Sequence, residues 1–261
     1  MSSSATLPTG VRAGAYRASV ADTPQLVRAA QRLRHQVFAV EHGARLDTRV
    51  PGLDVDEFDA ACDHLVVEHQ PTGELVGTYR LLPPGRRAGL YADTEFDLGA
   101  LDALRPMLIE AGRSCVHPEH RTGAAITTMW SALGRYALLS GHRYLAGCAS
   151  VPLADGGAAA AATWRLAETR HSAPAELRVR PHRPWLPRVD LPSRPSQALV
   201  PPLLRGYLRL GALVCGPPAH DPEFGVADFF VLLRLDRIDR RYLRYFGVDA
   251  SAPEPTRGQG E

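Results

Sequence analysis

The stretch Leu108-Ile-Glu-Ala-Gly-Arg-Ser-Cys-Val116 decides the fold, because it is an apolar strand that Gly112 interrupts near its middle. Residues 122–140 then place apolar side chains at helical spacing, which predicts a helix, and the short apolar run 144–150 predicts a second buried strand. A strand, a helix and a strand in this order predict a βαβ-like unit within an α/β fold.

The segments on either side predict the rest of the domain. Residues 24–40 should be helical, since Thr23 can cap a helix and Pro24 suits its first turn. Two β-rich runs flank a Gln-Pro-Thr-Gly turn and predict a hairpin. The hairpin strands are expected at 64–68 and 73–82, further helices at 158–167, 203–212 and 238–246, and an apolar strand at 229–235.

Composition suggests the domain boundaries. Residues 1–13 are rich in Ser and Thr and residues 251–261 in Pro, Gly and charge, so both ends should be disordered. Between them we expect a single domain over 14–250. Within it, residues 152–202 begin with a helix and continue through many prolines, and an irregular insertion of this length is typical of a lid or a binding loop.

Charge and cysteine content exclude several kinds of protein. Lysine is absent, so all 30 basic residues are arginines, and the formal net charge is only +2. Schiff-base chemistry and a P-loop lysine are therefore excluded, and a nucleic-acid surface is not indicated. The four cysteines are far apart, without metal-ligand spacing, so we expect neither a metal site nor disulfides. No signal peptide is recognisable, which predicts a cytoplasmic protein.

Four carboxylates lie within six residues of a loop expected over 42–59: Asp54, Asp56, Glu57 and Asp59. An acidic loop of this kind suits a cationic ligand, although a solvated acidic loop has the same sequence pattern. Asp228 directly precedes an apolar strand. A charge at that position needs a partner or a substrate amine, unless it simply faces solvent.

Nine segments, in this order and spacing, resemble the ornithine-lipid branch of the GNAT-type acyltransferases, the ornithine N-acyltransferases. They are Arg32-Leu-Arg-His-Gln-Val-Phe38, Asp54-Val-Asp-Glu-Phe-Asp59, Cys62-Asp-His-Leu65, Gly77-Thr-Tyr-Arg-Leu-Leu82, Glu95-Phe-Asp97, Glu110-Ala-Gly-Arg-Ser-Cys-Val116, Gly147-Cys-Ala-Ser150, Pro202-Leu-Leu-Arg-Gly-Tyr-Leu-Arg-Leu-Gly211 and Ala227-Asp-Phe229. A more distant resemblance is to the acyl-homoserine-lactone synthases.

This resemblance implies a GNAT-type fold with a mixed central sheet, splayed at a bulge and flanked by helices. It also implies transfer of a fatty or 3-hydroxyfatty acyl group to the α-amino group of ornithine or a similar amino acid. The donor would be an acyl chain on the phosphopantetheine of acyl carrier protein, or else on CoA, with no tightly bound cofactor. A lipid product would bring the protein to the inner face of the membrane.

The resemblance also implies roles for particular residues. Glu110, Asp56 and Arg113 would be catalytic, with Glu110 as the base that takes the amine proton. Glu110 and Arg113 would share one face of their strand only if a bulge at Gly112 realigns them; alternatively they form a structural ion pair. The residues expected to bind the amino acid are Arg34, Phe38, Asp59, Arg80 and Asp228, where an arginine could instead brace the acidic loop.

The donor phosphate should bind at the turn before residues 122–140, where free backbone amides begin a helix. This turn has one glycine, fewer than acetyl-CoA enzymes carry, which favours a carrier-protein phosphopantetheine over free CoA. The residues expected there are Val116, Arg121, Thr122, Gly123 and Ala124. Residues that could line an acyl tunnel, or simply form core, are Phe38, Met129, Trp130, Leu145 and Val151.

Two other functions fit the same sequence. One is synthesis of an N-acyl amino acid or acyl-homoserine-lactone signal, which would change the acceptor amine and keep the chemistry. The other is a non-catalytic module that binds an acyl group or its carrier protein. Loss of turnover on Glu110→Gln would separate an enzyme from a binding module.

Overall fold

The fold is organised by two neighbouring strands that pair with each other only where they begin. The structure is a computed structural model, and it describes residues 11–187, 194, 196–239 and 241–242. Strands β6 (Leu108–Val116) and β7 (Tyr144–Pro152) are parallel, and their register covers only Leu108 to Glu110 against Tyr144 to Ala146. Helix α2 (Gly123–Leu139) connects them, so the βαβ unit predicted from the sequence is confirmed.

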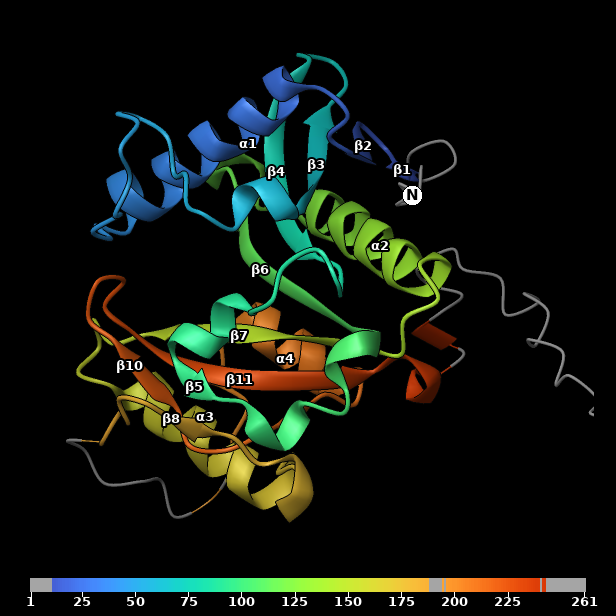
Figure 1. Cartoon of the computed structure of the whole chain (residues 1–261). Coiled ribbons are helices and arrows are strands. Elements are labelled where there is room, and N and C mark those ends of the chain that lie inside the picture. Colours follow the sequence, from blue (N-terminus) through green and yellow to red (C-terminus); the bar gives the residue numbers. More distant parts are fainter. Residues whose placement is uncertain (1–10, 188–193, 195, 240, 243–261) are drawn as a thin grey trace, which may run out of the picture.

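All other neighbours in the main sheet are antiparallel (Figure 1). The N-terminal half holds β1 (Val11–Ala13), β2 (Tyr16–Val20), β3 (Asp63–His69), β4 (Glu74–Leu82) and β6. The C-terminal half holds β7, β11 (Val226–Arg234), β10 (Ala219–Asp221) and β9 (Leu213–Val214). In Figure 1 β3 and β4 run almost vertically while β7 and β11 run across the view, so the two halves turn away from each other.

The divergence begins at a backbone contact. A Cβ atom on Gly147 of β7 would lie 2.1 Å from the carbonyl oxygen of Ala111, so only glycine permits the strands to touch there. Just beyond, Arg113 has φ +51°, and the register between β4 and β6 shifts between Thr78 and Arg80. This is a β-bulge, and it turns β6 away from β7. The expected sheet, splayed at a bulge, is confirmed.

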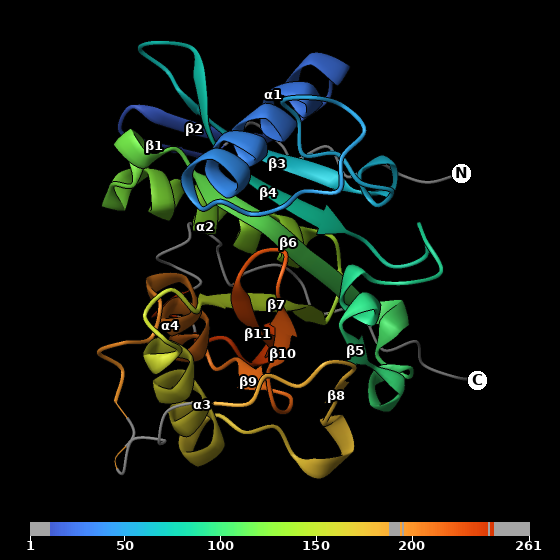
Figure 2. The ribbon, with the colours of Figure 1, turned by 90° about the vertical axis from the view of Figure 1, so that its left-hand side faces the viewer.

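Helices cover both faces of the sheet (Figure 2). In the N-terminal half, α1 (Pro24–His35) packs on one face, and α2 contacts β1 to β4 on the other. The Thr23 hydroxyl caps α1 by accepting the N–H of Leu26, and a π-helical turn, Gln36–Glu41, extends the helix. In the C-terminal half, α3 (Ala158–Arg170) and α4 (Pro202–Arg209) pack on the same side as α2.

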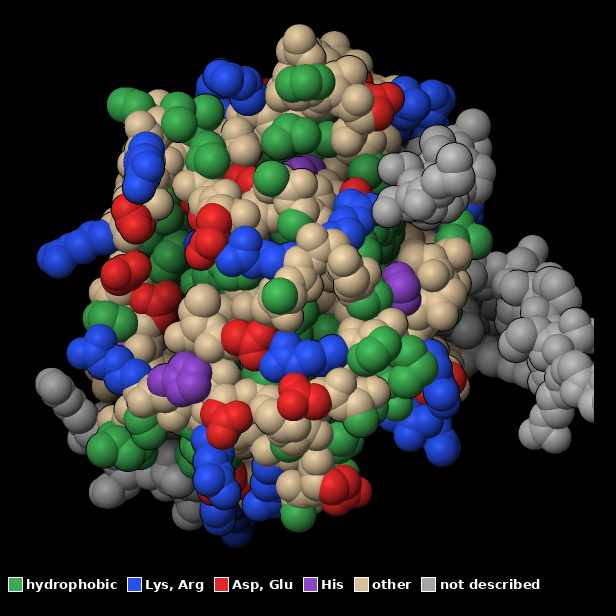
Figure 3. Space-filling model, in the orientation of Figure 1, with side chains coloured by type: hydrophobic (Ala, Val, Ile, Leu, Met, Phe, Trp, Pro, Cys, Tyr) green, Lys and Arg blue, Asp and Glu red, His purple; other side chains and the backbone are tan. Residues whose placement is uncertain are grey.

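The remaining elements are short. The opposite face of β7 and β11 is covered by the segment around β5 (Phe96–Asp97), which pairs with β8 (Arg180–Pro181). Single 3-10 turns lie at Asp59–Ala61, Tyr91–Thr94, Gly99–Leu101, Arg105–Met107, Pro118–His120, Ala175–Leu177 and Leu235–Arg237. In the described part of the chain no helix is both long and apolar enough to cross a bilayer. Acidic and basic side chains intermingle on the face in Figure 3.

Several expectations differ from the structure. Residues 11–13, expected to be disordered, form β1, while residues 1–10 and 251–261 lie outside the described residues. The helix expected at 238–246 falls largely outside them too. The segment 152–202 contains α3, whose Leu166 and Ala167 are buried against the sheet, so its described helix belongs to the core rather than to a lid. Strands β1, β2, β9 and β10 were not predicted, because they are short or lack a clear alternation.

Candidate active site

The gap between β6 and β7 contains a cavity of about 950 Å³. Its lining includes Leu145 and Leu233, which face α2, and also Cys148 and Asp228, which face the β5 segment. Successive strand residues point to opposite faces, so the cavity reaches both sides of the sheet at the splay. Its volume is near the upper end of the roughly 300–1,000 Å³ typical of small-molecule sites.

One wall of the cavity carries three carboxylates. Glu95 lies before β5, Asp221 ends β10 and Asp228 lies in β11, and one oxygen from each falls within 4.8 Å of the others. Asp228 is only 2% exposed and accepts a 2.6 Å hydrogen bond from the Ser150 hydroxyl. Glu95 Oε2 is buried without a hydrogen-bond partner. Carboxylates at this spacing suit either an ammonium group or a metal ion.

Two of these carboxylates, Glu95 and Asp228, have raised pKa values. Burial is the main cause of the raised pKa of Glu95, and the nearby charges of Asp228 and Asp221 add to it. Burial likewise raises the pKa of Asp228, although the hydrogen bond from Ser150 opposes the shift. Two acids with raised pKa values retain protons more readily than isolated carboxyls, and an incoming cation could replace those protons.

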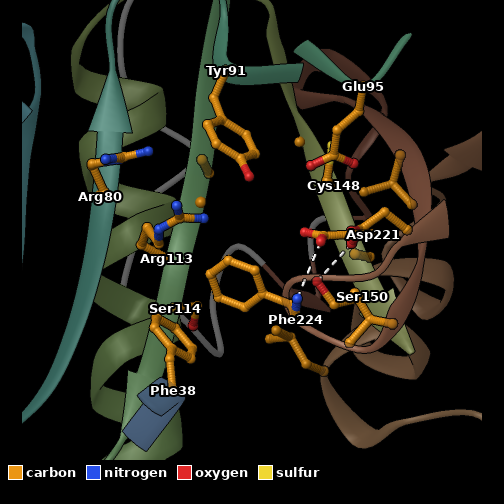
Figure 4. A pocket seen from close by; sticks show the side chains of 18 of the residues that line it. Phe38, Arg80, Tyr91, Glu95, Arg113, Ser114, Cys148, Ser150, Asp221 and Phe224 are labelled. Atoms are coloured by element: carbon orange, nitrogen blue, oxygen red, sulfur yellow. Dashed lines mark hydrogen bonds between the residues drawn. The ribbon is translucent and has the colours of Figure 1, made fainter. Parts of the chain in front are cut away.

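The opposite wall carries Arg113 and Tyr91 (Figure 4). The Arg113 guanidinium carbon lies 4.7 Å from the ring centre of Tyr91 and 4.9 Å from that of Phe224. Its Nε is 3.4 Å from Asp54 and its Nη2 is 3.6 Å from Asp56, both longer than good hydrogen bonds. Nε is also buried without a hydrogen-bond partner. Two long ion pairs therefore connect Arg113 to the acidic loop, while its guanidinium lies between two aromatic rings at the cavity wall.

Glu110 lines the cavity, but both of its oxygens are engaged. The backbone N–H groups of Tyr91 and Ala92 donate to Oε2 and Oε1 at 2.7 and 2.8 Å. Burial raises the Glu110 pKa, and these two hydrogen bonds oppose the shift. Glu110 forms no ion pair with Arg113, although the bulge at Arg113 lets both side chains contact Tyr91. This geometry gives Glu110 a clear positioning function, and its role as the base stays a prediction.

The acidic loop forms a closed ion-pair network beside the cavity. Arg34, fully buried, donates to both oxygens of Asp59 at 3.0 and 2.8 Å, and its Nε lies 2.9 Å from Asp54. Arg80 donates to Asp56 at 2.5 Å and to Asp59 at 2.9 Å. Burial alone would raise the Asp59 pKa, but the two arginines outweigh it and lower the value to about 2.

Arg80 is the member of this network that lines the cavity. Arg113 beside it and Phe38 from the π-helical turn also line the cavity. Arg34, Asp56 and Asp59, all predicted as site residues, do not. The described geometry makes Arg34 a brace between α1 and the loop, which was the alternative role considered for it. Any part that Asp56 and Asp59 play in catalysis or binding would be indirect, through the position of Arg80 and Arg113.

The expected donor-phosphate residues lie outside the cavity lining. Helix α2 begins at Gly123 with Thr122 as its cap, and residues 121–124 are exposed. Arg121 donates to the carbonyl of Val116 and forms two 2.6 Å bonds with Glu41, which does line the cavity. Glu41 therefore connects this turn to the cavity. The assignment of Val116, Arg121, Thr122, Gly123 and Ala124 to the donor phosphate stays a prediction.

Comparison with known proteins identifies the family of this chain. Residues 33–131 match the acetyltransferase (GNAT) domain family. The L-ornithine N(alpha)-acyltransferase of Brucella abortus is 35% identical over 263 residues, which cover 92% of each chain. That of Rhizobium meliloti is 36% identical over 248 residues, 86% of this chain and 81% of the relative. The chain belongs to the L-ornithine N(alpha)-acyltransferase family. The resemblance found in the sequence is thereby confirmed, and the protein is an acyltransferase.

Solved structures support the family's fold. A CoA-dependent acyl-homoserine lactone synthase, BjaI, determined with SAM and isopentyl-CoA, aligns with a TM-score of 0.54. The alignment covers 88% of this chain and 84% of that one at 17% identity. This likeness confirms the GNAT-type fold and carries no information about the acceptor.

Sequence reasoning missed much of the carboxylate wall of this family member. Asp228 was identified from its place before an apolar strand, but Glu95 and Asp221 were not singled out. They are 126 residues apart, and only the pairing of β10 with β11 brings Asp221 beside Asp228. One signal was available for Glu95, since it opens the Glu95-Phe-Asp97 segment of the resemblance. Nothing in the local sequence marks Asp221 or Tyr91.

Proposed function

We propose that this protein transfers a fatty or 3-hydroxyfatty acyl group from a phosphopantetheine thioester to the α-amino group of ornithine. The observation that carries the proposal is a pair of oppositely charged groups on facing walls of one cavity. The Arg113 guanidinium lies on one wall and the Glu95 carboxylate on the other, where Glu95 Oε2 is buried without a hydrogen bond (Figure 4). An amino acid presents the complementary charges on a single carbon.

Ornithine fits these walls better than a neutral amino acid does. Its carboxylate would pair with Arg113, whose planar guanidinium suits that group. Its two ammonium groups carry more positive charge than one carboxylate can neutralise, and the wall of Glu95, Asp221 and Asp228 offers three. The relatives' names support the same acceptor.

The chemistry needs a neutral amine. We assign the proton of the α-ammonium group to the Glu95 and Asp228 pair, whose raised pKa values make them better bases than ordinary carboxylates. The amine nitrogen then forms a bond to the thioester carbon and loses one of its two remaining protons. The carbon–sulfur bond breaks, and that proton ends on the sulfur, which leaves as a thiol. Glu110 fixes the Tyr91–Thr94 turn that carries Tyr91 to the opposite wall.

The donor arm would enter through the splay. Beyond Glu110 the edge of β6 has no pairing with β7, so its free backbone groups face the gap and could bind an extended pantetheine chain. The phosphate would then lie at the start of α2. Its single glycine, and the engagement of Arg121 by Glu41, favour the single phosphate of acyl carrier protein over CoA.

Membrane contact at the cavity mouth is a smaller part of this proposal. Glu41, His42, Gly43 and Arg45 line the cavity, and the chain on either side exposes Val40 (71%) and Val50 (39%). A long-chain product could pass from here to a lipid surface. Co-sedimentation with phospholipid vesicles should fall in the double variant Val40→Ser/Val50→Ser, and unchanged binding would contradict this step.

The test of function is mass spectrometry of products formed from purified protein. Palmitoyl and 3-hydroxypalmitoyl groups are supplied separately on acyl carrier protein and on CoA. The acceptors are ornithine, lysine, 2-aminopentanoic acid and S-adenosylmethionine. The aminopentanoic acid has the chain of ornithine without its second amine, so it isolates the contribution of that group.

We expect Nα-acylornithine, formed faster from the carrier protein. Equal acylation of aminopentanoic acid would remove the proposed role of the three carboxylates. An acyl-homoserine lactone would establish signal synthesis instead. Binding of acyl carrier protein without any product would indicate the non-catalytic module.

A further inference from the structure

The cavity has an apolar end, and it lies on the α2 and α4 side of the sheet. Its lining there consists of Tyr79, Leu145, Leu203, Tyr207, Ala212 and Leu233. On β7 the polar end reaches Ser150, five residues from Leu145, which corresponds to about 17 Å of strand. If the proposed function is right, an acyl chain would leave the carboxylates and extend toward this apolar end.

A second, smaller cavity lies directly behind that end. It has a volume of about 20 Å³, space for about one water molecule, and its lining includes Trp130, Leu133, Leu210 and Ile238. Three residues, Leu145, Tyr207 and Leu233, line both cavities. They form a partition between the larger cavity and a small space that is lined by apolar side chains.

Tyr207 is the largest member of the partition, and its neighbours hold it in place. Its hydroxyl forms a hydrogen bond with that of Tyr79 on β4, across the apolar end of the cavity. Its ring centre lies 4.7 Å from that of Trp130. Gly206 allows this approach, since a Cβ there would come within 3.0 Å of the Trp130 ring. Burial raises the Tyr79 pKa to about 12, so this side chain stays neutral.

We propose that Tyr207 closes the acyl-chain pocket and limits the length of the transferred chain, and that the cavity behind it is the space a longer chain would enter. This proposal rests on the proposed acyl transfer. A chain that reached the Tyr207 ring could not extend further without displacing a side chain packed on two sides, and overpacking of that kind is costly.

The experiment measures transfer to ornithine from saturated acyl carrier proteins of 12, 14, 16, 18 and 20 carbons. In Tyr207→Ala the loss of the ring joins the two cavities. We expect the longest accepted chain to increase by two or more carbons, and the ratio of rates for the newly accepted chain to the shorter one to rise about tenfold or more, since each methylene in an apolar site changes rates by roughly 10–200-fold.

Two further variants make the test specific. Tyr207→Phe keeps the ring and loses only the hydroxyl bond to Tyr79, so its length profile should match that of the wild type. Ala212→Leu adds volume to the apolar end beside Tyr207, whose carbonyl accepts the Ala212 N–H, and should shorten the longest accepted chain. This variant keeps the proposal testable if Tyr207→Ala does not fold.

The outcomes separate the two proposals. If the wild type acylates no amine from any donor, the proposed function fails before the variants are compared. If the wild type transfers acyl chains and neither Tyr207→Ala nor Ala212→Leu moves the length limit, only the role of Tyr207 is overturned. A shift in Tyr207→Phe equal to that in Tyr207→Ala would assign the limit to the hydroxyl pair rather than to the ring.

Discussion

Two groups of carboxylates lie a short distance apart in this molecule and do different things. Asp54, Asp56 and Asp59 are bonded to Arg34 and Arg80, and none of the three lines the cavity. Glu95, Asp221 and Asp228 all line it, and none of these three forms an ion pair with an arginine among the described residues. The first group is neutralised by the protein itself, while the second leaves charge for a ligand.

The pKa values follow the same division. Arg34 and Arg80 overcome burial and lower the pKa of Asp59, whereas burial and neighbouring acids raise the pKa of Glu95. Buried carboxylates with counter-ions stabilise a fold or at least hold it in register, and buried carboxylates without them are typical of functional sites. The number of acids in a sequence segment therefore says less than the identity of their partners.

The largest expected effect is on activity, from Glu95→Gln. We expect the kcat/KM for ornithine to fall by about 10²–10⁴-fold, the range of a lost general base, with unfolding stability kept or raised. Steady-state acylation and thermal denaturation would be measured on the same preparation. Full activity in Glu95→Gln would end the distinction drawn between the two carboxylate groups.

Substitution of Arg34, which braces the acidic loop, should mainly reduce the stability of the fold. Arg34→Met leaves Asp54 and Asp59 without their main counter-ion, and removing one partner of a buried pair costs about 3–5 kcal/mol of unfolding free energy. Urea denaturation measures the change. Arg86→Met is the matched control, because the Arg86 pair with Asp63 is partly exposed and should contribute about 0–1 kcal/mol. Equal effects of the two variants would contradict a special role for Arg34.

Glu110→Gln tests whether Glu110 belongs to either group. A glutamine has one acceptor for the two N–H groups of Tyr91 and Ala92, so we expect a stability loss of about 1–3 kcal/mol. Turnover should fall moderately, with an unchanged pH profile. Loss of the acidic limb of the pH–rate profile, together with a fall of about 10²-fold or more, would instead identify Glu110 as the base.

Arg113→Lys should weaken acceptor binding. The charge remains, but the planar pair of donors for a carboxylate is lost. We expect the KM for ornithine to rise about tenfold, in line with the ~1.5–3 kcal/mol of a hydrogen bond to a charged group, and kcat to change less. A fall confined to kcat would place Arg113 near the thioester carbonyl instead of the acceptor.

The smallest effect concerns stability and pH. Because the folded pKa of Glu95 is raised, the folded state keeps a proton that the unfolded state loses above the ordinary carboxyl pKa, so this group lowers stability as pH rises. Glu95→Gln should reduce the pH dependence of stability by up to about 1.4 kcal/mol per pH unit, the free energy that corresponds to one pKa unit. Denaturation midpoints at pH 5 and pH 8 would measure it, and identical slopes in both proteins would contradict the raised pKa.

Much of the fold could be predicted because its signals are local. Gly112 within an apolar strand indicated the bulge, and the helical spacing of residues 122–140 indicated α2. The short strands β9 and β10 gave no such signal, because each is held by pairing with β11 rather than by its own pattern. The position of α3 against β7 also depends on tertiary packing, which the composition of 152–202 does not encode.

Site prediction had a different limit. Glu110, Arg113 and Asp228, three of the predicted site residues, line one cavity, and their roles there stay predictions. Residue type could not separate the carboxylates of residues 54–59 from those of the cavity, because their partners Arg34 and Arg80 come from a distant helix and a neighbouring strand. Whether a buried carboxylate is structural or functional depends on its counter-ion, and the fold determines which counter-ion lies beside it.

The contact between Gly147 and Ala111 has an evolutionary consequence. The point where the two halves of the sheet separate is made of backbone alone, with no room for a Cβ atom. Side chains that line the cavity can therefore be exchanged without moving the place where the two strands separate. The proposed meeting place of acyl donor and amine is therefore set by the backbone, independently of which amine or chain length the side chains select.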